Sequence, residues 1–514
     1  NRNSLNNKGS KMAALRQIAF YGRGVSASLR LLLGLCFTIQ VGRADRMDPQ
    51  TIGFMPAVEL AELIRTKKIS PVEYMSTLLV RIAELEPTLN AFAYLAADQA
   101  MDEARKAEAA VMSGARIGRL HGVAVTIKDH SDTKDMPTQH GSKITAGDQP
   151  VNDAPLVERL RAEGAIVIGK TTVPEMGWTG VSRSPLTGIT SNPWRPGYNA
   201  GASSAGAGAA AAAGFGPLHQ GSDGAGSIRM PAHFCGIFGL KPSFGRVPNY
   251  PASAADMTTH NGPMTRTVSD SALMLEVMAG PHFLDYTTLE AGPTNYLARL
   301  RDGVKGKRIA YSPDLGFARV DPEVAQLVKA AAARFTELGA IVEEVSTPWA
   351  KDGPELIRFF WSAHLTSLSK YIPRWEVEMD PGLVACIRHS KNVSVEQYQE
   401  MRYRKLDYVA NIHRWFQDWD FLLTPSASVT AFPAEKLMPD HWPTHPWDWI
   451  MWAEFSYPFN MSWNPAASVP CGFTSTGLPV GLQIVGKRFN DLGVLQAAAA
   501  FEQLQPWADK RPQL

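Results

Sequence analysis

The most informative stretch of this chain runs from residue 221 to residue 231 and reads GSDGAGSIRMP. Gly224, Ala225, Gly226 and Ser227 are all small, so they leave the backbone uncovered and let its N–H groups point at one external oxygen. An acyl-transfer nucleophile needs this layout, a hydroxyl beside a preformed oxyanion hole. The turn therefore predicts Ser227 as a nucleophile and the backbone N–H groups of the four residues as its oxyanion hole, although Gly-rich turns without any chemistry are common.

Two upstream segments strengthen this interpretation. Residues 200–213 read AGASSAGAGAAAAA, which is typical of a buried helix with close backbone packing, but the paired hydroxyls of Ser203 and Ser204 need partners if buried. Residues 121–129 read HGVAVTIKD, an apolar strand that ends on Lys128. A lysine at a strand end is usually a solvated surface charge. The carboxyl ends of strands are also where α/β sheets place their sites, so Lys128 is a candidate too.

Together the three segments resemble the amidase signature family of serine hydrolases, and the likeness extends over roughly residues 49–505. Two positions depart from the usual pattern, because Ala202 and Ala225 stand where glycine is common; neither change removes a backbone donor. Further parts of the pattern are SNP at 191–193, FGLKPSFGRVP at 238–248, PCGF at 470–473 and GLPVGLQIVG at 477–486.

The resemblance implies a Ser-cisSer-Lys triad. Ser227 would be the nucleophile, Ser203 the bridging serine after a cis peptide bond, and Lys128 the base, with Ser204 helping to hold the lysine. Burial without a carboxylate partner lowers the pKa of a lysine, so a neutral amine could take a proton from Ser203 while Ser203 takes one from Ser227. Water would later release the acyl group from the enzyme.

A supporting pair of charges lies in the same stretch. Asp223 is expected to hydrogen-bond the turn or to pair with Arg229, and not to act as an acid or base itself. No metal ligand set and no cofactor motif accompanies these residues. Residues 164–171 read GAIVIGKT and match the P-loop expression, but 165–168 read as a buried strand where a phosphate-binding loop would be needed.

Alternating strands and helices predict an α/β fold. A strand at 123–127, a helix at 156–163 and a strand at 166–168 indicate a sheet sandwiched by helices. The resemblance implies a single large domain with a mixed, twisted central sheet. We expect an amidase signature domain over residues 47–514, with an aromatic-rich substrate-pocket insertion around 349–463.

Residues 1–46 differ from the rest and are expected to be a signal-like or disordered N-terminal extension. Basic residues precede an apolar run at 31–41, as in a signal peptide, but the run is too short to span a bilayer. Translated upstream sequence is the alternative. A cytoplasmic location is favoured, and export through this segment is the other possibility.

Composition agrees with an enzyme rather than a nucleic-acid-binding protein. The 514 residues are 45% hydrophobic and 19% charged, and the net charge of +2 offers no electrostatic attraction for nucleic acid. Four cysteines without regular spacing indicate neither a disulfide framework nor a zinc cluster. No obligate partner subunit is expected, and a homo-oligomer is possible.

The substrate is expected to be a small molecule with a neutral, hydrophobic acyl or aryl group joined through an amide or carbamate (urethane) bond. The chain is similar to aryl acylamidases and urethane hydrolases, and no Arg/Asp clamp for free glutamine is recognisable. The alternatives are a glutamine-hydrolysing A subunit of a tRNA-dependent amidotransferase and a catalytically silent binding protein. Aromatic residues that could line the pocket gather at Phe359, Phe360, Trp361 and Trp375, and at Trp442, Trp447, Trp449, Trp452, Phe455, Tyr457, Phe459 and Trp463.

Overall fold

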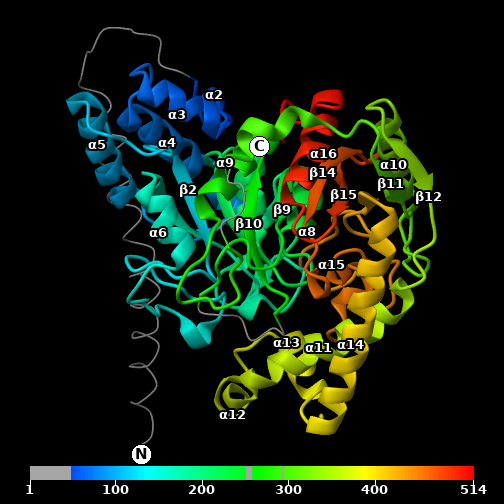
Figure 1. Ribbon diagram of the computed structural model, residues 1–514. Coiled ribbons are helices and arrows are strands. Elements are labelled where there is room, and N and C mark those ends of the chain that lie inside the picture. Colours follow the sequence, from blue (N-terminus) through cyan, green and yellow to red (C-terminus); the bar gives the residue numbers. More distant parts are fainter. Residues whose placement is uncertain (1–47, 251–256, 291–294) are drawn as a thin grey trace, which may run out of the picture. The chain divides into compact units, whose positions relative to one another are not determined.

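The computed structural model describes residues 48–250, 257–290 and 295–514. The expectations for residues 1–46 therefore lie outside the described part of the chain. An 11-stranded mixed sheet runs through the structure in the order β1-β3-β2-β8-β10-β9-β14-β15-β13-β11-β12, with helices packed against it (Figure 1). The predicted fold class, a mixed sheet covered by helices, is confirmed.

The parallel strands that carry the candidate lysine lie deep in the sheet. β2 (Ala124–Lys128) pairs in parallel with β3 (Ile166–Thr171) on one side and with β8 (Leu218–Asp223) on the other, and all three strands are buried. Strands covered on both faces are expected to be almost continuously apolar, as β2 is. Because β3 includes the Gly-Lys-Thr of the P-loop look-alike, that segment is a core strand.

The small-residue segment forms a helix that lies in a narrow space. α7 (Ala205–Ala213) is buried at every residue. A Cβ added to Gly206 would lie 2.1 Å from the carbonyl oxygen of Ala91 and 2.5 Å from the amide nitrogen of Thr172. No larger residue fits this approach, so the composition of the segment follows from its packing.

Antiparallel strands join the two halves of the sheet. β8 pairs with β10 (His260–Thr265), which pairs with β9 (Phe238–Lys241), and the sheet continues through β14 (Ala466–Phe473) and β15 (Pro479–Gly486). At the far edge of the sheet the strands are parallel again. This edge comprises β13 (Phe421–Pro425), β11 (Arg308–Tyr311) and β12 (Ile341–Glu344), with α10 (Pro322–Ala333) between the last two in the sequence.

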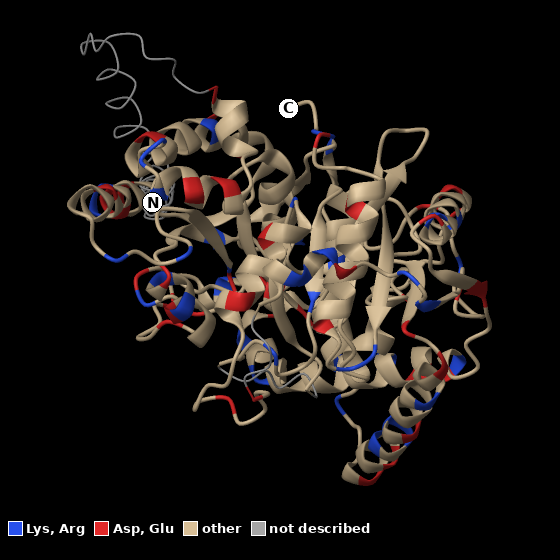
Figure 2. Ribbon diagram, turned by 45° about the horizontal axis from the view of Figure 1, so that its top comes forward, with Lys and Arg blue, Asp and Glu red and all other residues tan. Residues whose placement is uncertain are grey.

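A helical layer lies at the bottom of Figure 1, built from the region predicted as an insertion. It contains α11 (Gly353–Leu365), α12 (Ile372–Trp375), α13 (Pro381–His389) and α14 (Val395–Trp415). Acidic and basic residues are interspersed along α14, so this helix does not carry charge of one sign only (Figure 2). Its role as a separate insertion remains a prediction.

The remaining elements are the edge strand β1, two small two-stranded sheets, β4-β5 and β6-β7, and further helices. None of the helices in the described residues is long and apolar enough to cross a membrane. These elements are α2 (Pro49–Gly53), α3 (Ala57–Arg65), α4 (Pro71–Leu89), β1 (Phe92–Leu95), α5 (Ala97–Ser113), α6 (Pro155–Ala162), β4 (Arg183–Ser184), β5 (Gly188–Ile189), β6 (Ser191–Asn192), β7 (Arg195–Asn199), α8 (Arg229–Cys235), α9 (Val268–Met278), α15 (Tyr457–Met461) and α16 (Asp491–Leu504).

Candidate active site

The amine of Lys128 lies at the carboxyl end of β2 and is completely buried. Its Nζ atom is 2.7 Å from Ser203 Oγ, 2.9 Å from Ser222 Oγ and 3.1 Å from the Ser222 carbonyl oxygen. Within the described residues, no carboxylate forms an ion pair with it. The amine is therefore held by two serines alone.

Burial changes the acid–base behaviour of this amine. Loss of hydration lowers the pKa of Lys128 from its usual 10.5 to about 7, although the negative charge of Asp223 opposes the shift. A neutral amine has two N–H groups and one lone pair. If the two Ser222 oxygens accept the N–H groups, the lone pair faces the Ser203 hydroxyl, as a base requires.

The two other predicted triad residues line one cavity of about 370 Å³. Ser203 follows a cis peptide bond, Ala202–Ser203, as the resemblance implies. Ser203 and Ser227 are each only 4% exposed, and the Ser204 amide donates to the Ser227 carbonyl at 3.2 Å, which ties the two loops together. The Ser227 hydroxyl makes no hydrogen bond to another described residue, so it is free to meet a substrate.

The Asp223 carboxylate shapes the turn that precedes Ser227. Its Oδ1 accepts a hydrogen bond from the Gly226 amide at 2.7 Å, and its Oδ2 accepts one from the Ile228 amide at 3.1 Å. The expectation that Gly226 contributes an oxyanion donor is therefore wrong, because its N–H is already used. The amides of Gly224, Ala225 and Ser227 have no partner within the described chain and remain as candidate donors.

The alanine that departs from the family pattern fits this turn. Ala225 is buried without strain, whereas the next residue, Gly226, has a φ of 111° and could not carry a side chain. A Cβ there would lie 2.6 Å from Ser456 Oγ. Ser456 in turn donates to the Ala225 carbonyl at 2.6 Å, so the turn is fixed from outside as well.

Asp223 pairs with Arg229 through two parallel hydrogen bonds of 2.9 Å, as the sequence predicts. Burial alone would raise the pKa of the Asp223 carboxyl, but the Arg229 guanidinium outweighs it and holds that pKa well below its usual range. The carboxylate therefore stays ionised and cannot act as an acid or base. Arg229 also donates to Gln483 Oε1 at 2.7 Å and Asn460 Oδ1 at 2.6 Å, which anchors the turn to the core.

Ser204, which is expected to help hold the lysine, contacts it only indirectly. Ser204 makes no hydrogen bond to Lys128 in the described structure. Its hydroxyl donates to the Ser222 carbonyl at 3.1 Å and accepts from the Ser222 amide at 3.2 Å. Ser204 therefore acts one step away, through Ser222, which sequence reasoning missed although it stands in the quoted 221–231 stretch.

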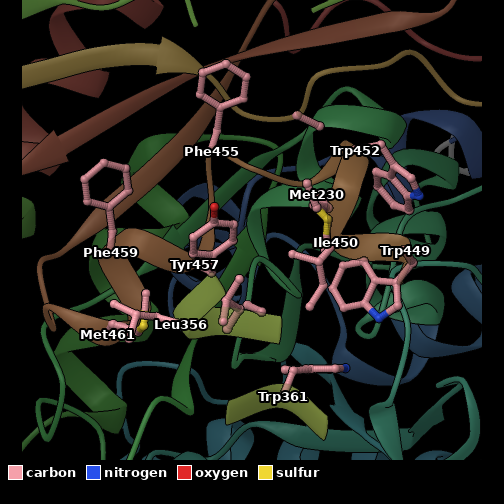
Figure 3. Close-up of a cluster of buried hydrophobic side chains, with 14 of the residues drawn as sticks. Met230, Leu356, Trp361, Trp449, Ile450, Trp452, Phe455, Tyr457, Phe459 and Met461 are labelled. Carbon is pink, nitrogen blue, oxygen red and sulfur yellow. The ribbon is translucent and has the colours of Figure 1, made fainter. Parts of the chain in front are cut away.

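The cavity wall combines polar and apolar residues. No Lys or Arg among the described residues lines it. Trp361 is the one Trp, Tyr or Phe of those residues on its wall. The rings of the second predicted aromatic group, except Trp463, pack into the buried core, as Figure 3 shows for Trp449, Trp452 and Tyr457. Lining residues include the polar His130, Asp132 and Asn261 and the apolar Trp361, Leu365 and Leu368.

No group of His, Cys, Asp and Glu in the described structure is arranged to hold a metal ion. Cys235, Cys386 and Cys471 are buried free thiols.

Comparison with known proteins finds relatives that cover most of the chain. A family model described as Amidase matches residues 73–495. An acylamidase from Rhodococcus erythropolis is 36% identical over 481 residues, which cover 91% of this chain and 98% of that protein. The A subunit of a glutamyl-tRNA(Gln) amidotransferase from a Cyanothece species is 33% identical over 482 residues, 89% of this chain and 99% of that protein.

A solved structure is also similar to this chain over most of its length. A bacterial aryl acylamidase of the amidase signature (AS) enzymes family has a TM-score of 0.83 and 30% sequence identity, and the match covers 90% of this chain and 99% of that one. Sequence and fold therefore agree over nearly the whole length of these relatives. On these grounds the chain belongs to the Amidase family and is an amidase signature hydrolase.

Proposed function

We propose that this hydrolase cleaves the C–N bond of neutral amides or carbamates through an acyl-enzyme formed on Ser227. The observation that carries the proposal is the carboxylate-free Lys128 amine, 2.7 Å from Ser203 Oγ at the cavity that also exposes Ser227. Such an amine can be neutral near pH 7, and only a neutral amine can accept a proton.

Acylation begins with two proton transfers. The Lys128 amine takes the proton of the Ser203 hydroxyl, and Ser203 Oγ takes that of Ser227. Ser227 Oγ then attacks the carbonyl carbon, and the amides of Gly224, Ala225 and Ser227 stabilise the oxyanion, each free donor contributing about 3–4 kcal/mol. The preformed turn costs no reorganisation at this moment.

Collapse of the tetrahedral intermediate runs the same relay backwards. The Lys128 ammonium returns its proton through Ser203 to the leaving nitrogen, the C–N bond breaks, and the amine departs. Water then attacks the acyl-enzyme, again with Lys128 and Ser203 taking its proton, and Ser227 is released. From an amide the product is a carboxylic acid, and from a carbamate it is a carbonic monoester, which loses carbon dioxide.

The cavity favours a neutral substrate over free glutamine. The carboxylate of glutamine needs a cationic partner when buried, and no Lys or Arg of the described residues lines the wall. The relative named as an acylamidase supports the same conclusion. The similarity to the amidotransferase protein keeps glutamine hydrolysis as the second candidate.

A panel of substrates given to the purified chain alone separates these functions. We expect amine release from a 4-nitroanilide and from an aryl carbamate, and none from glutamine, because the wall offers no counter-charge. Release of 4-nitroaniline measures cleavage of the anilide, and a coupled ammonia assay measures hydrolysis of glutamine. Turnover of glutamine alone, or turnover that requires a second protein, would contradict the proposal.

The Ser222 hydroxyl should tune the base without reacting itself. Since it accepts a hydrogen bond from the Lys128 amine, it stabilises the ammonium form more than the neutral form. Ser222→Ala should lower kcat/KM by about 10-fold at neutral pH through lost positioning, and it should move the acidic limb of the pH–rate profile to lower pH. Ser222→Thr keeps the hydroxyl and serves as the control. An unchanged limb in Ser222→Ala would argue against this role.

A further inference from the structure

One side chain of the cavity wall has hydrogen-bonding capacity that the proposed mechanism does not use. His130 lies two residues after Lys128, in the turn that follows β2, and its amide donates to the Lys128 carbonyl at 2.7 Å. Neither ring nitrogen bonds to any described residue, and Nε2 is buried. Buried polar atoms are normally paired, so this imidazole calls for a functional explanation.

The ring stands next to the bridging serine. A Cβ placed on Gly177 would be 2.5 Å from His130 Cε1 and 3.4 Å from Ser203 Oγ, so the imidazole edge and the Ser203 hydroxyl border the same point of the cavity wall. Ser203 is the hydroxyl that returns a proton to the leaving nitrogen in the proposed mechanism. His130 therefore lies on the leaving-group side of the scissile bond.

His130 is a neutral imidazole. Burial is the main cause that lowers its pKa well below the usual value. The ring of His140 lies 5.2 Å away, and burial lowers its pKa to about 4, so it too is neutral near pH 7. A neutral imidazole offers one donor and one acceptor, and the acceptor can take an N–H group from a ligand.

The chemistry of amide cleavage supplies such an N–H group. When Ser227 attacks, the amide nitrogen becomes pyramidal and its lone pair turns toward Ser203 to receive the proton. The remaining N–H points elsewhere and needs an acceptor. An acceptor that engages it mainly in the transition state raises the rate of this step, whereas an ester has no N–H to offer.

We propose that His130 accepts a hydrogen bond from the N–H of the leaving nitrogen, and that it thereby selects secondary amides and N–H carbamates over esters and N-alkylated amides. This inference rests on the proposed function, because it assumes acyl transfer to Ser227. His130 would be a specificity-determining residue, in contact with the leaving group and not part of the proton relay.

Three substrates with one acyl group test this assignment: a 4-nitroanilide, its N-methyl analogue and the 4-nitrophenyl ester. We expect His130→Leu to lower the ratio of kcat/KM for the anilide to kcat/KM for the ester by about 10-fold or more. His130→Gln, whose side-chain carbonyl can accept the same N–H, should recover part of that ratio. Leu368→Ala alters the same wall without removing a hydrogen bond, so it should change all three substrates in parallel.

Loss of activity in the same proportion for all three substrates would overturn the proposal, because it would show a purely structural role. An unchanged ratio in His130→Leu would overturn it as well. Should His130→Leu fail to fold, the ratios of His130→Gln and His130→Asn decide, since the shorter amide of asparagine cannot reach as far. The proposed function itself fails on a different result, turnover that persists in Ser227→Ala, so the two failures are distinguishable.

Discussion

Replacing Ser227 with alanine should reduce kcat/KM for an amide substrate by about 10⁴-fold or more, because the nucleophile disappears while the relay and the oxyanion donors stay in place. The fold should be unaffected. The Ser227 hydroxyl makes no hydrogen bond to another described residue, so its removal leaves no buried group without a partner. Steady-state kinetics and thermal unfolding of the two proteins check both halves of this expectation.

A second serine of the same cavity provides the matched control. Ser367 lines the wall with its hydroxyl bonded to the His364 carbonyl at 3.2 Å, and Ser367→Ala should retain most of the activity. A phosphonylating reagent should add its mass to wild type on Ser227 and not to Ser227→Ala. Substantial turnover by Ser227→Ala, or equal labelling of both proteins, would show that another group carries the acyl chain.

Much of the fold near the site follows from local sequence patterns. The strand predicted at 123–127 is β2, and the all-small helix is α7, because hydrophobic alternation and residue size are read directly from the chain. The order of the eleven strands does not follow from local sequence patterns. It depends on contacts between residues far apart in the sequence, such as those that join β8 to β10 and β9 to β14.

In the candidate site, too, contacts between residues close in sequence are predicted, whereas contacts that depend on strand pairing are not. The Asp223–Arg229 pair is found correctly, since its members lie close together around one turn. Ser222 is missed as the partner of Lys128 because the two residues meet only through the register of β2 against β8. The free N–H expected at Gly226 fails because the sequence indicates that Asp223 can hydrogen-bond the turn but not which amide of the turn it engages.

The aromatic residues show that composition alone does not predict which rings line the pocket. Apolar rings are equally suited to a core and to a pocket, so density in the sequence does not separate the two. Trp361, Trp449 and Trp452 all belong to the main buried hydrophobic cluster (Figure 3). Of the three, only Trp361, on α11, also lines the cavity. Which rings line the cavity is decided by the position of α11, which packs against α13 and α14, and not by the number of rings.

The second large effect should come from Lys128. In wild type, kcat/KM should rise with pH and level off above about 7, because burial lowers the pKa of this amine to about 7 and only its neutral form accepts the Ser203 proton. Lys128→Ala should lower the rate at pH 7 by about 10³-fold or more and remove the limb near pH 7. Its rate should recover in part at high pH, where hydroxide can deprotonate the serines. Flat profiles for both proteins would contradict a lysine base.

The same amine should make the free energy of unfolding depend on pH, an effect that can be measured without substrate. In the unfolded chain it titrates near 10.5, so between pH 7 and 10.5 the unfolded state holds a proton that the folded state lacks. The contribution of this amine to the free energy of unfolding of wild type therefore increases as the pH rises from 7 to 10.5. The same contribution is lost as the pH falls back to 7. Lys128→Met has no such group. Its free energy of unfolding relative to wild type should fall by about 2 kcal/mol from pH 7 to pH 9, measured by denaturant titration. A difference that stays constant would mean that the buried amine keeps its proton, and the base would have to be sought elsewhere.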